Sequence, residues 1–331
     1  MERLTAIFEE SIMQKGKPAT AGSKMLADFI SPIDATVAER LESAGIDITG
    51  RARMDEFGLR GLLSGSECQS LNAQDGALTG AVDVFEAMGS LTGGKPDLIF
   101  CNDFNGSLSH AAAAQGVYYI HPTYGTVSRY GLIPAVSSMD QIGVACRTPE
   151  NGFRALRIIA GYDPKDGAMI PEKVTGKNVP ANLICETGFE SGYSGLYAQV
   201  TQILSCAELS NNISRYDGIK YGYRAKEYNS LQELYTKSRT EAFGPELKLA
   251  AILGTMVLSQ ENYKRYYDKA MRMRRVIKES LDFDNYDVIV TQCPLLSRLC
   301  GLPSLTTPER VYIADAGRED ILEAVSLSFQ Q

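Results

Sequence analysis

Short apolar runs that alternate with helix-like segments are the feature that most limits the fold of this chain. Residues 97–101 read DLIFC and residues 287–290 read DVIV, so each run predicts a buried strand. Residues 150–159 (ENGFRALRII) instead carry apolar side chains at helical spacing and end before Gly161. Such alternation is typical of an α/β fold with several parallel pairings. The same patterns predict strands at 46–49 and 117–120, and helices at 35–44, 77–90, 111–114, 231–243, 246–281 and 319–329.

The composition is that of a globular protein without a membrane span. Of the 331 residues, 44% are hydrophobic and 22% are charged, and no repeat or composition shift divides the chain. We therefore expect a single domain over residues 1–331. No run of 18 apolar residues predicts a membrane helix, and the acidic start of the chain is unlike a secretory leader. A net charge of −7 argues against direct, non-specific binding of nucleic acid.

The cysteines and histidines argue against disulfide and metal chemistry. Seven cysteines are scattered with no CxxC spacing, and the chain has only two histidines. A disulfide scaffold and a zinc site are therefore not expected, and a reducing cytoplasm is the simplest location. The sequence also has no P-loop and no dinucleotide-binding fingerprint, so no cofactor is implied.

A polar turn after the strand at 97–101 is the first candidate for chemistry. Residues 102–107 read NDFNGS and precede an alanine-rich helical segment. This layout can expose the hydroxyl of Ser107 as a nucleophile. It can also aim the backbone N–H groups of Phe104, Asn105 and Gly106 at an anion, as in an oxyanion hole. The alternative is an ordinary turn in which Ser107 caps the helix.

The segment 121–143, HPTYGTVSRYGLIPAVSSMDQIG, changes this balance because it resembles the amidase signature family. Within that family, the resemblance is greatest to the A-subunit branch of the tRNA-dependent amidotransferases. It implies the amidase signature fold, a mixed and mostly parallel central sheet covered by helices. A fold alone does not establish an activity. Further matching segments, in family order, are 15–24, 34–41, 54–57, 215–222, 238–244, 253–255 and 301–303.

The resemblance assigns a role to three positions. The family uses a serine nucleophile, a second serine that bridges, and a lysine that accepts the proton. The nucleophile position is Ser107, and the lysine position is occupied by Glu9. The Gly- and Ser-rich run that should hold the bridging serine is absent. Its counterpart is residues 78–84, with Asp83 nearest to the bridging position.

These departures predict a degenerate catalytic triad. A carboxylate is a far weaker base than a neutral amine, and its negative charge opposes the formation of an alkoxide at Ser107. The first hypothesis is therefore a protein that has lost amide hydrolysis and serves as a binding or assembly subunit. The second is an active amidohydrolase, or a glutamine-dependent amidotransferase subunit, with a rewired base. The groups that could take part in rewiring are Glu9, Asp83, Lys15, Lys24, Ser64, Ser66 and Ser90.

The resemblance also suggests a ligand and a partner. Arg239 occupies the position that clamps the substrate carboxylate in the family, although an ion pair with Glu241 or Asp217 is equally consistent with the sequence. A small amide such as glutamine is the expected ligand, and an amidase or amidotransferase subunit is the expected partner. The pocket side of the fold is trimmed, because an acidic loop of the family is absent between Cys293 and Leu302. His110 and His121 are expected to be structural. A basic stretch over 264–275 is expected to be a solvated helix face, with an acidic partner or tRNA as the alternative.

Overall fold

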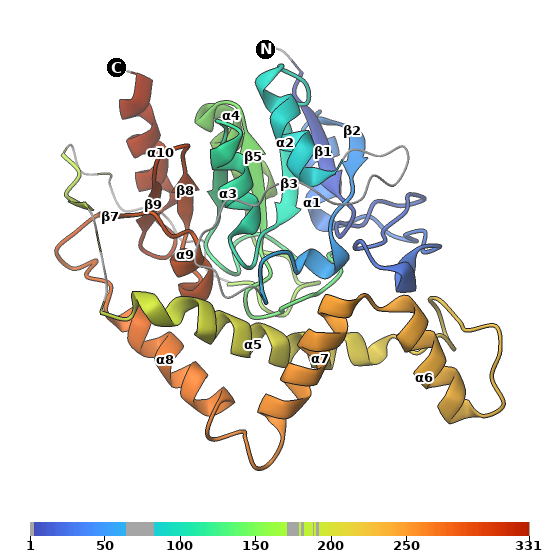
Figure 1. The fold of residues 1–331 in the computed structure, drawn as a ribbon. Helices are drawn as coiled ribbons and strands as arrows, with labels where there is room; N and C mark the ends of the chain where they lie inside the picture. Colours follow the sequence, from blue (N-terminus) through green and yellow to red (C-terminus); the bar gives the residue numbers. More distant parts are fainter. Residues whose placement is uncertain are drawn as a thin grey trace.

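A large mixed β-sheet forms the centre of the molecule (Figure 1). The structure, a computed structural model, describes residues 3–63, 83–170, 179, 182–187, 189 and 192–330. In this part of the chain the sheet has nine strands in the order β2-β1-β3-β5-β4-β8-β9-β7-β6. The strands are β1 (Thr5–Glu9), β2 (Asp47–Ala52), β3 (Leu98–Asn102), β4 (Tyr118–His121), β5 (Ile142–Cys146), β6 (Cys185–Thr187), β7 (Val288–Thr291), β8 (Ser304–Thr306) and β9 (Val311–Ala314).

Parallel pairing is confined to the two ends of the sheet. Strand β1 runs parallel to β2 and β3, and β6 runs parallel to β7, whereas the pairs from β3 through β5, β4, β8 and β9 to β7 are antiparallel. The α/β class and the mixed sheet are confirmed, but parallel pairs do not predominate as expected. A short connection explains one of the antiparallel pairs: β8 and β9 form a hairpin across residues 307–310, which is too short for the crossover that a parallel pair requires.

Helices cover both faces of the sheet. They are α1 (Thr36–Ser43), α2 (Val84–Thr92), α3 (Ser107–Ala114), α4 (Pro149–Ile159), α5 (Tyr197–Asn212), α6 (Leu231–Ala242), α7 (Pro245–Leu258), α8 (Tyr267–Glu279), α9 (Leu295–Cys300) and α10 (Glu319–Leu327). Of these helices, α5, α7 and α8 lie across one end of the strands (Figure 1). The predicted helix at 246–281 is two helices, α7 and α8, which meet at a bend in residues 259–266 (Figure 1). None of the helices in the described ranges is both long and apolar enough to cross a membrane.

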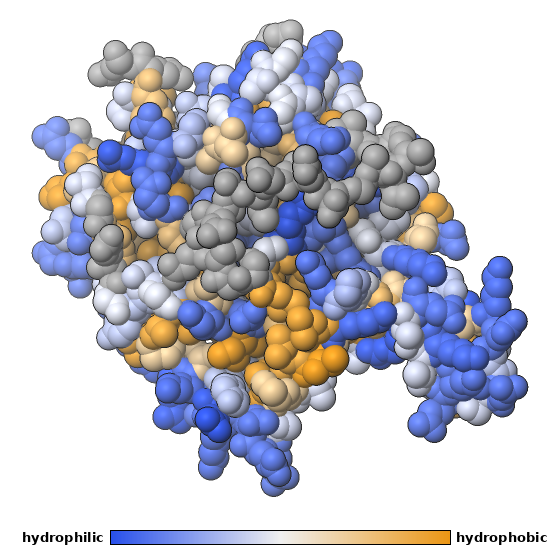
Figure 2. All heavy atoms as spheres, in the orientation of Figure 1, coloured by the Kyte–Doolittle hydropathy of each residue, from blue (hydrophilic) through white to orange (hydrophobic). Residues whose placement is uncertain are grey.

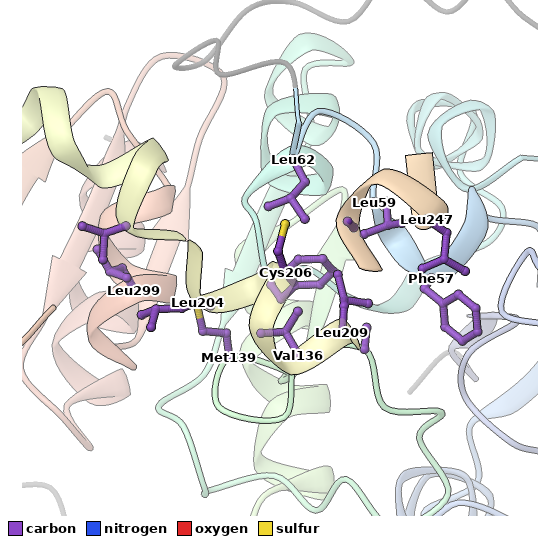
Figure 3. Packing of buried hydrophobic residues seen from close by; sticks show 14 of the residues in the cluster. Phe57, Leu59, Leu62, Val136, Met139, Leu204, Cys206, Leu209, Leu247 and Leu299 are labelled. Carbon is purple, nitrogen blue, oxygen red and sulfur yellow. The ribbon is translucent and has the colours of Figure 1, made fainter. Parts of the chain in front are cut away.

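Three apolar clusters hold these layers together. On one face of the sheet, Phe8 and Phe100 pack with residues of α1, α4 and α10. On the other face, Ile99 and Tyr119 pack with α2 and α3. The third cluster joins α5, α7, α8 and α9 to the loops at the ends of the strands, including Phe104. Figure 3 shows its centre, where α5 presents Leu204, Cys206 and Leu209 to side chains that include Leu59, Leu62, Val136 and Met139.

Close packing of α5 against α7 depends on one glycine. A Cβ atom at Gly254 would lie 2.0 Å from the backbone oxygen of Cys206, so no side chain fits there. We expect Gly254→Ala to lower the free energy of unfolding by about 2 kcal/mol, measured by urea denaturation. The matched control is Gly195→Ala, since a Cβ at that position meets no atom within 4 Å. Equal effects of the two substitutions would contradict this account of the interface.

Candidate functional site

The turn between β3 and α3 presents Ser107 at the start of a helix. Strand β3 ends at Asn102, and Ser107 is the first residue of α3. Gly106 has a φ of +80°, a conformation that favours glycine. The backbone N–H of Ser107 donates to Oδ1 of Asn105 (3.1 Å). The Nδ2 group of Asn105 donates to the carbonyl oxygen of Arg60 (3.0 Å), which ties the turn to the neighbouring loop. The strand, turn and helix thus follow in the predicted order.

Three backbone donors of this turn are uncommitted. Among the residues that the structure describes, no acceptor pairs with the N–H groups of Phe104, Asn105 and Gly106. The hydroxyl of Ser107 is half-buried and likewise makes no hydrogen bond to a described residue. Backbone N–H groups in this state suit a carbonyl oxygen or another anionic group. These three N–H groups are therefore available to an acceptor that approaches the turn.

A buried ion pair between Asp103 and Arg298 holds the turn in place. Asp103 accepts hydrogen bonds from the backbone N–H groups of Leu108 (3.0 Å) and Ser109 (3.1 Å), and so caps the first turn of α3. Its Oδ2 atom lies 2.9 Å from Nη2 of Arg298, which comes from α9. Both side chains have no solvent exposure. Arg298 also donates from Nη1 to the hydroxyl of Ser304 (2.8 Å) on strand β8.

Glu9 ends strand β1, next to the strand that leads into the turn. Its carboxyl group is buried, and Oε1 accepts a hydrogen bond from the hydroxyl of Ser11 (2.5 Å). Its Oε2 atom has no hydrogen-bond partner. No ion pair of Glu9 with a described residue is formed, although the half-buried guanidinium of Arg51 is close enough to interact with it electrostatically. Burial raises the pKa of the Glu9 carboxyl to about 8, and the nearby carboxylates of Asp55 and Asp103 raise it further. At neutral pH this position therefore holds a mostly protonated acid.

Asp83 is placed as a helix cap. Its Oδ1 atom accepts from the backbone N–H of Phe85 (2.9 Å) at the start of α2, and Arg60 lies 3.9 Å from its other oxygen. Residues 78–82, the rest of the segment that corresponds to the family's Gly- and Ser-rich run, lie outside the described residues, as do Ser64 and Ser66. Ser90 lies within α2 and donates to the backbone oxygen of Ala87 (2.6 Å), a local helix bond.

Arg239 lies on α6, at the outer end of the helical layer (Figure 1). Its guanidinium group stands over the ring of Phe243 at 5.3 Å, and burial lowers its pKa. Within the described ranges it forms an ion pair with neither Glu241 nor Asp217. Glu241 instead accepts from the hydroxyl of Tyr223 (2.5 Å).

The side chains of the two lysines and the two histidines considered from the sequence make no hydrogen bond to Ser107 within the described residues. Lys15 and Lys24 are exposed, and Nζ of Lys24 donates to the backbone oxygen of Glu241 (3.2 Å). His121 is buried in β4 with an unpartnered Nδ1, and burial places its pKa well below the usual value. His110 lies in α3, and burial also lowers its pKa.

Arg298 and Ser11, which contact the two acidic groups of the site, were not predicted from the sequence. A weak signal existed for Arg298, because it is the single charge in the apolar run LLSRLC before Gly301. A lone charge in such a run predicts a buried ion pair but does not name its partner. Ser11 carried no signal, since a serine two residues after a strand end is common in turns.

Breaking the buried ion pair between Asp103 and Arg298 should strongly destabilise the fold. We expect Arg298→Met to lower the free energy of unfolding by about 3–5 kcal/mol, because it leaves Asp103 buried without a counter-charge. The matched control is Arg157→Met, which breaks an exposed pair with Glu323 (2.6 Å) and should lower it by less than about 1 kcal/mol. Urea denaturation measures both, and similar losses in the two variants would rule out the proposed role of Arg298.

The raised pKa of Glu9 predicts a pH-dependent stability. Between pH 4.5 and about 8 an unfolded chain ionises this group while the folded chain keeps its proton, so the contribution of Glu9 to stability falls as pH rises. Glu9→Gln removes this loss. Relative to wild type, we expect the variant to gain up to about 4 kcal/mol of unfolding free energy between these pH values. Denaturation curves collected across the range test this, and a difference independent of pH would refute it.

Comparison with known proteins identifies the family. The sequence profile of the family described as Amidase matches residues 7–67, 98–185 and 189–311. The A subunit of glutamyl-tRNA(Gln) amidotransferase from Lachnoclostridium phytofermentans is 34% identical over 363 aligned positions, which cover 93% of this chain and 70% of that protein.

Solved structures show the same fold at lower identity. The native peptide amidase from Stenotrophomonas maltophilia superposes with a TM-score of 0.73 at 18% identity, covering 99% of this chain and 82% of that one. The A subunit of glutamyl-tRNA(Gln) amidotransferase from Thermotoga maritima superposes with a TM-score of 0.61 at 23% identity, covering 96% and 80%. The profile match and the curated relative together place this chain in the amidase family, as a protein similar to the A subunit of the amidotransferase.

Proposed function

We propose that this chain has lost Ser-Ser-Lys amide hydrolysis and acts as a binding or assembly subunit. The observation that carries the proposal is the buried, unpaired carboxyl group of Glu9 at the family's lysine position. Proton transfer from Ser107 requires a base that is deprotonated at the working pH. With a pKa raised to about 8 by burial, Glu9 already holds its proton at neutral pH, and on losing it adds a negative charge.

What the site keeps is the capacity to bind. The uncommitted N–H groups of Phe104, Asn105 and Gly106 support a proposal that the turn receives the carbonyl oxygen of a small amide such as glutamine. The guanidinium of Arg239, which makes no hydrogen bond to a described residue, is proposed to hold a ligand carboxylate. Because the relatives named above are subunits of an amidotransferase, we propose another subunit of such an enzyme, or of an amidase, as the partner.

One observation favours a second candidate, an amidohydrolase that uses Glu9 as its base. A general base is most effective when its pKa lies near the working pH, and the value of about 8 meets that condition in mildly alkaline solution. This candidate predicts turnover that rises with pH through about 8.

Direct assays separate the two candidates. On the purified protein we expect no hydrolysis of glutamine or simple amides above background, and no covalent labelling by a fluorophosphonate probe. The authentic A subunit from Thermotoga maritima, in complex with its own partner proteins, is the positive control for both measurements. In the inactive protein Ser107→Ala should change neither signal.

Three results would contradict the proposal or establish the second candidate. Turnover or labelling that disappears in Ser107→Ala would overturn the inactive assignment. If that turnover also rises through pH 8 and is lost in Glu9→Gln, the rewired base is established. Ser43→Ala is the matched control for labelling, since Ser43 is an exposed serine whose hydroxyl only donates to the backbone oxygen of Glu39.

A further inference from the structure

Helix α7 is apolar on two faces, although the fold buries only one. Residues 249–260 (LAAILGTMVLSQ) contain no charged residue. The buried face, formed by Leu247, Ala250, Gly254 and Val257, packs on α5. A surface helix of a globular protein ordinarily turns a polar face outward. The outer face of α7 departs from this rule.

The outer face carries an exposed apolar stripe. Leu249, Ile252 and Met256 follow one another at helical spacing and are 47%, 66% and 41% exposed. Leu253, between them, is partly buried. Figure 2 shows apolar side chains gathered on this part of the surface, over the position of α7 in Figure 1. A contiguous exposed stripe of this kind is typical of a contact surface.

Cations lie directly after the stripe. Residues 259–279, which contain the bend and α8, hold seven Lys or Arg against three Asp or Glu, although the chain as a whole has a net charge of −7. Tyr263 lies in the bend after α7 and is exposed. Lys264 and Arg265, which follow it, are exposed as well. In the described ranges Lys264, Arg265 and Lys269 form no ion pair. The surface therefore combines an apolar stripe with unpaired positive charge at its C-terminal end.

From this combination we infer that α7 and the bend after it form a docking surface for an acidic amphipathic helix of a partner protein. The partner's apolar face covers Leu249, Ile252 and Met256, and its acidic flank meets Lys264 and Arg265. A second copy of this chain fits less well, because it would bring the same unpaired cations and the same net negative charge. The biological use of the surface rests on the proposed function as an assembly subunit.

A designed peptide tests the surface directly. The probe is a fluorescein-labelled peptide of about 18 residues with a leucine stripe at i, i+3, i+4 and i+7 and glutamate on both flanks. A second peptide with lysine in place of glutamate is the charge control. By fluorescence anisotropy we expect micromolar binding of the acidic peptide to the purified protein. The lysine peptide should bind at least about 10-fold more weakly.

Variants assign the binding to the stripe and to the cations. The double variant Ile252→Ser with Met256→Ser should weaken acidic-peptide binding at least about 10-fold. Lys264→Glu with Arg265→Glu should weaken it and remove most of its dependence on salt. The matched control is Leu231→Ser on α6, which removes an apolar side chain that is 61% exposed but lies outside the surface, and should leave binding unchanged.

Several results would overturn the inference. These are absence of acidic-peptide binding, equal binding by all variants, a dimer in sedimentation that Ile252→Ser with Met256→Ser dissociates, and binding to phosphatidylserine vesicles that the same variant abolishes. Hydrolysis measured on the same samples reports on the proposed function separately. Turnover with intact peptide binding would reject the inactive assignment and leave the docking surface in place.

Discussion

The buried pair of Asp103 and Arg298 is the constraint on which the site depends. The two residues are 195 positions apart in the chain, and their side chains meet without solvent access. Removing both charges from water is expensive, so the pair persists only because further hydrogen bonds satisfy it. Asp103 uses its oxygens to cap α3, and Arg298 reaches the hydroxyl of Ser304 on β8. The turn that presents Ser107 is thus fixed to the middle of the sheet.

Local patterns predicted much of the fold because they depend only on neighbouring residues. The run at 97–101 became β3, and the amphipathic segment at 150–159 became α4 with almost the same bounds. Strand β1 was not predicted, because its five residues end in a glutamate and lack an uninterrupted apolar run. Strand order and direction were beyond local reasoning as well, since pairing joins segments that lie far apart in the chain.

The site was predictable where the family resemblance fixed a position and unpredictable where tertiary contacts decide. The resemblance placed Ser107 and Glu9, and the structure puts the latter at the end of the strand beside β3. The contacts of Ser11 with Glu9 and of Asp83 with the start of α2 each span only two residues, so local sequence can carry them. The pairing of Asp103 with Arg298 joins segments 195 positions apart, and no periodicity in the sequence encodes it.

A change of residue at one buried position can separate binding from chemistry in this fold. The backbone donors of the turn do not depend on the identity of residue 9, so the proposed capacity to accept a carbonyl group survives a glutamate there. Proton removal does depend on it under the proposed function, because burial raises the pKa of the Glu9 carboxyl. Selection on such a chain would then act on surfaces that recognise partners. The charge-free outer face of α7 is the kind of surface that this situation preserves, since exposed Leu249 and Ile252 contribute little to the fold itself.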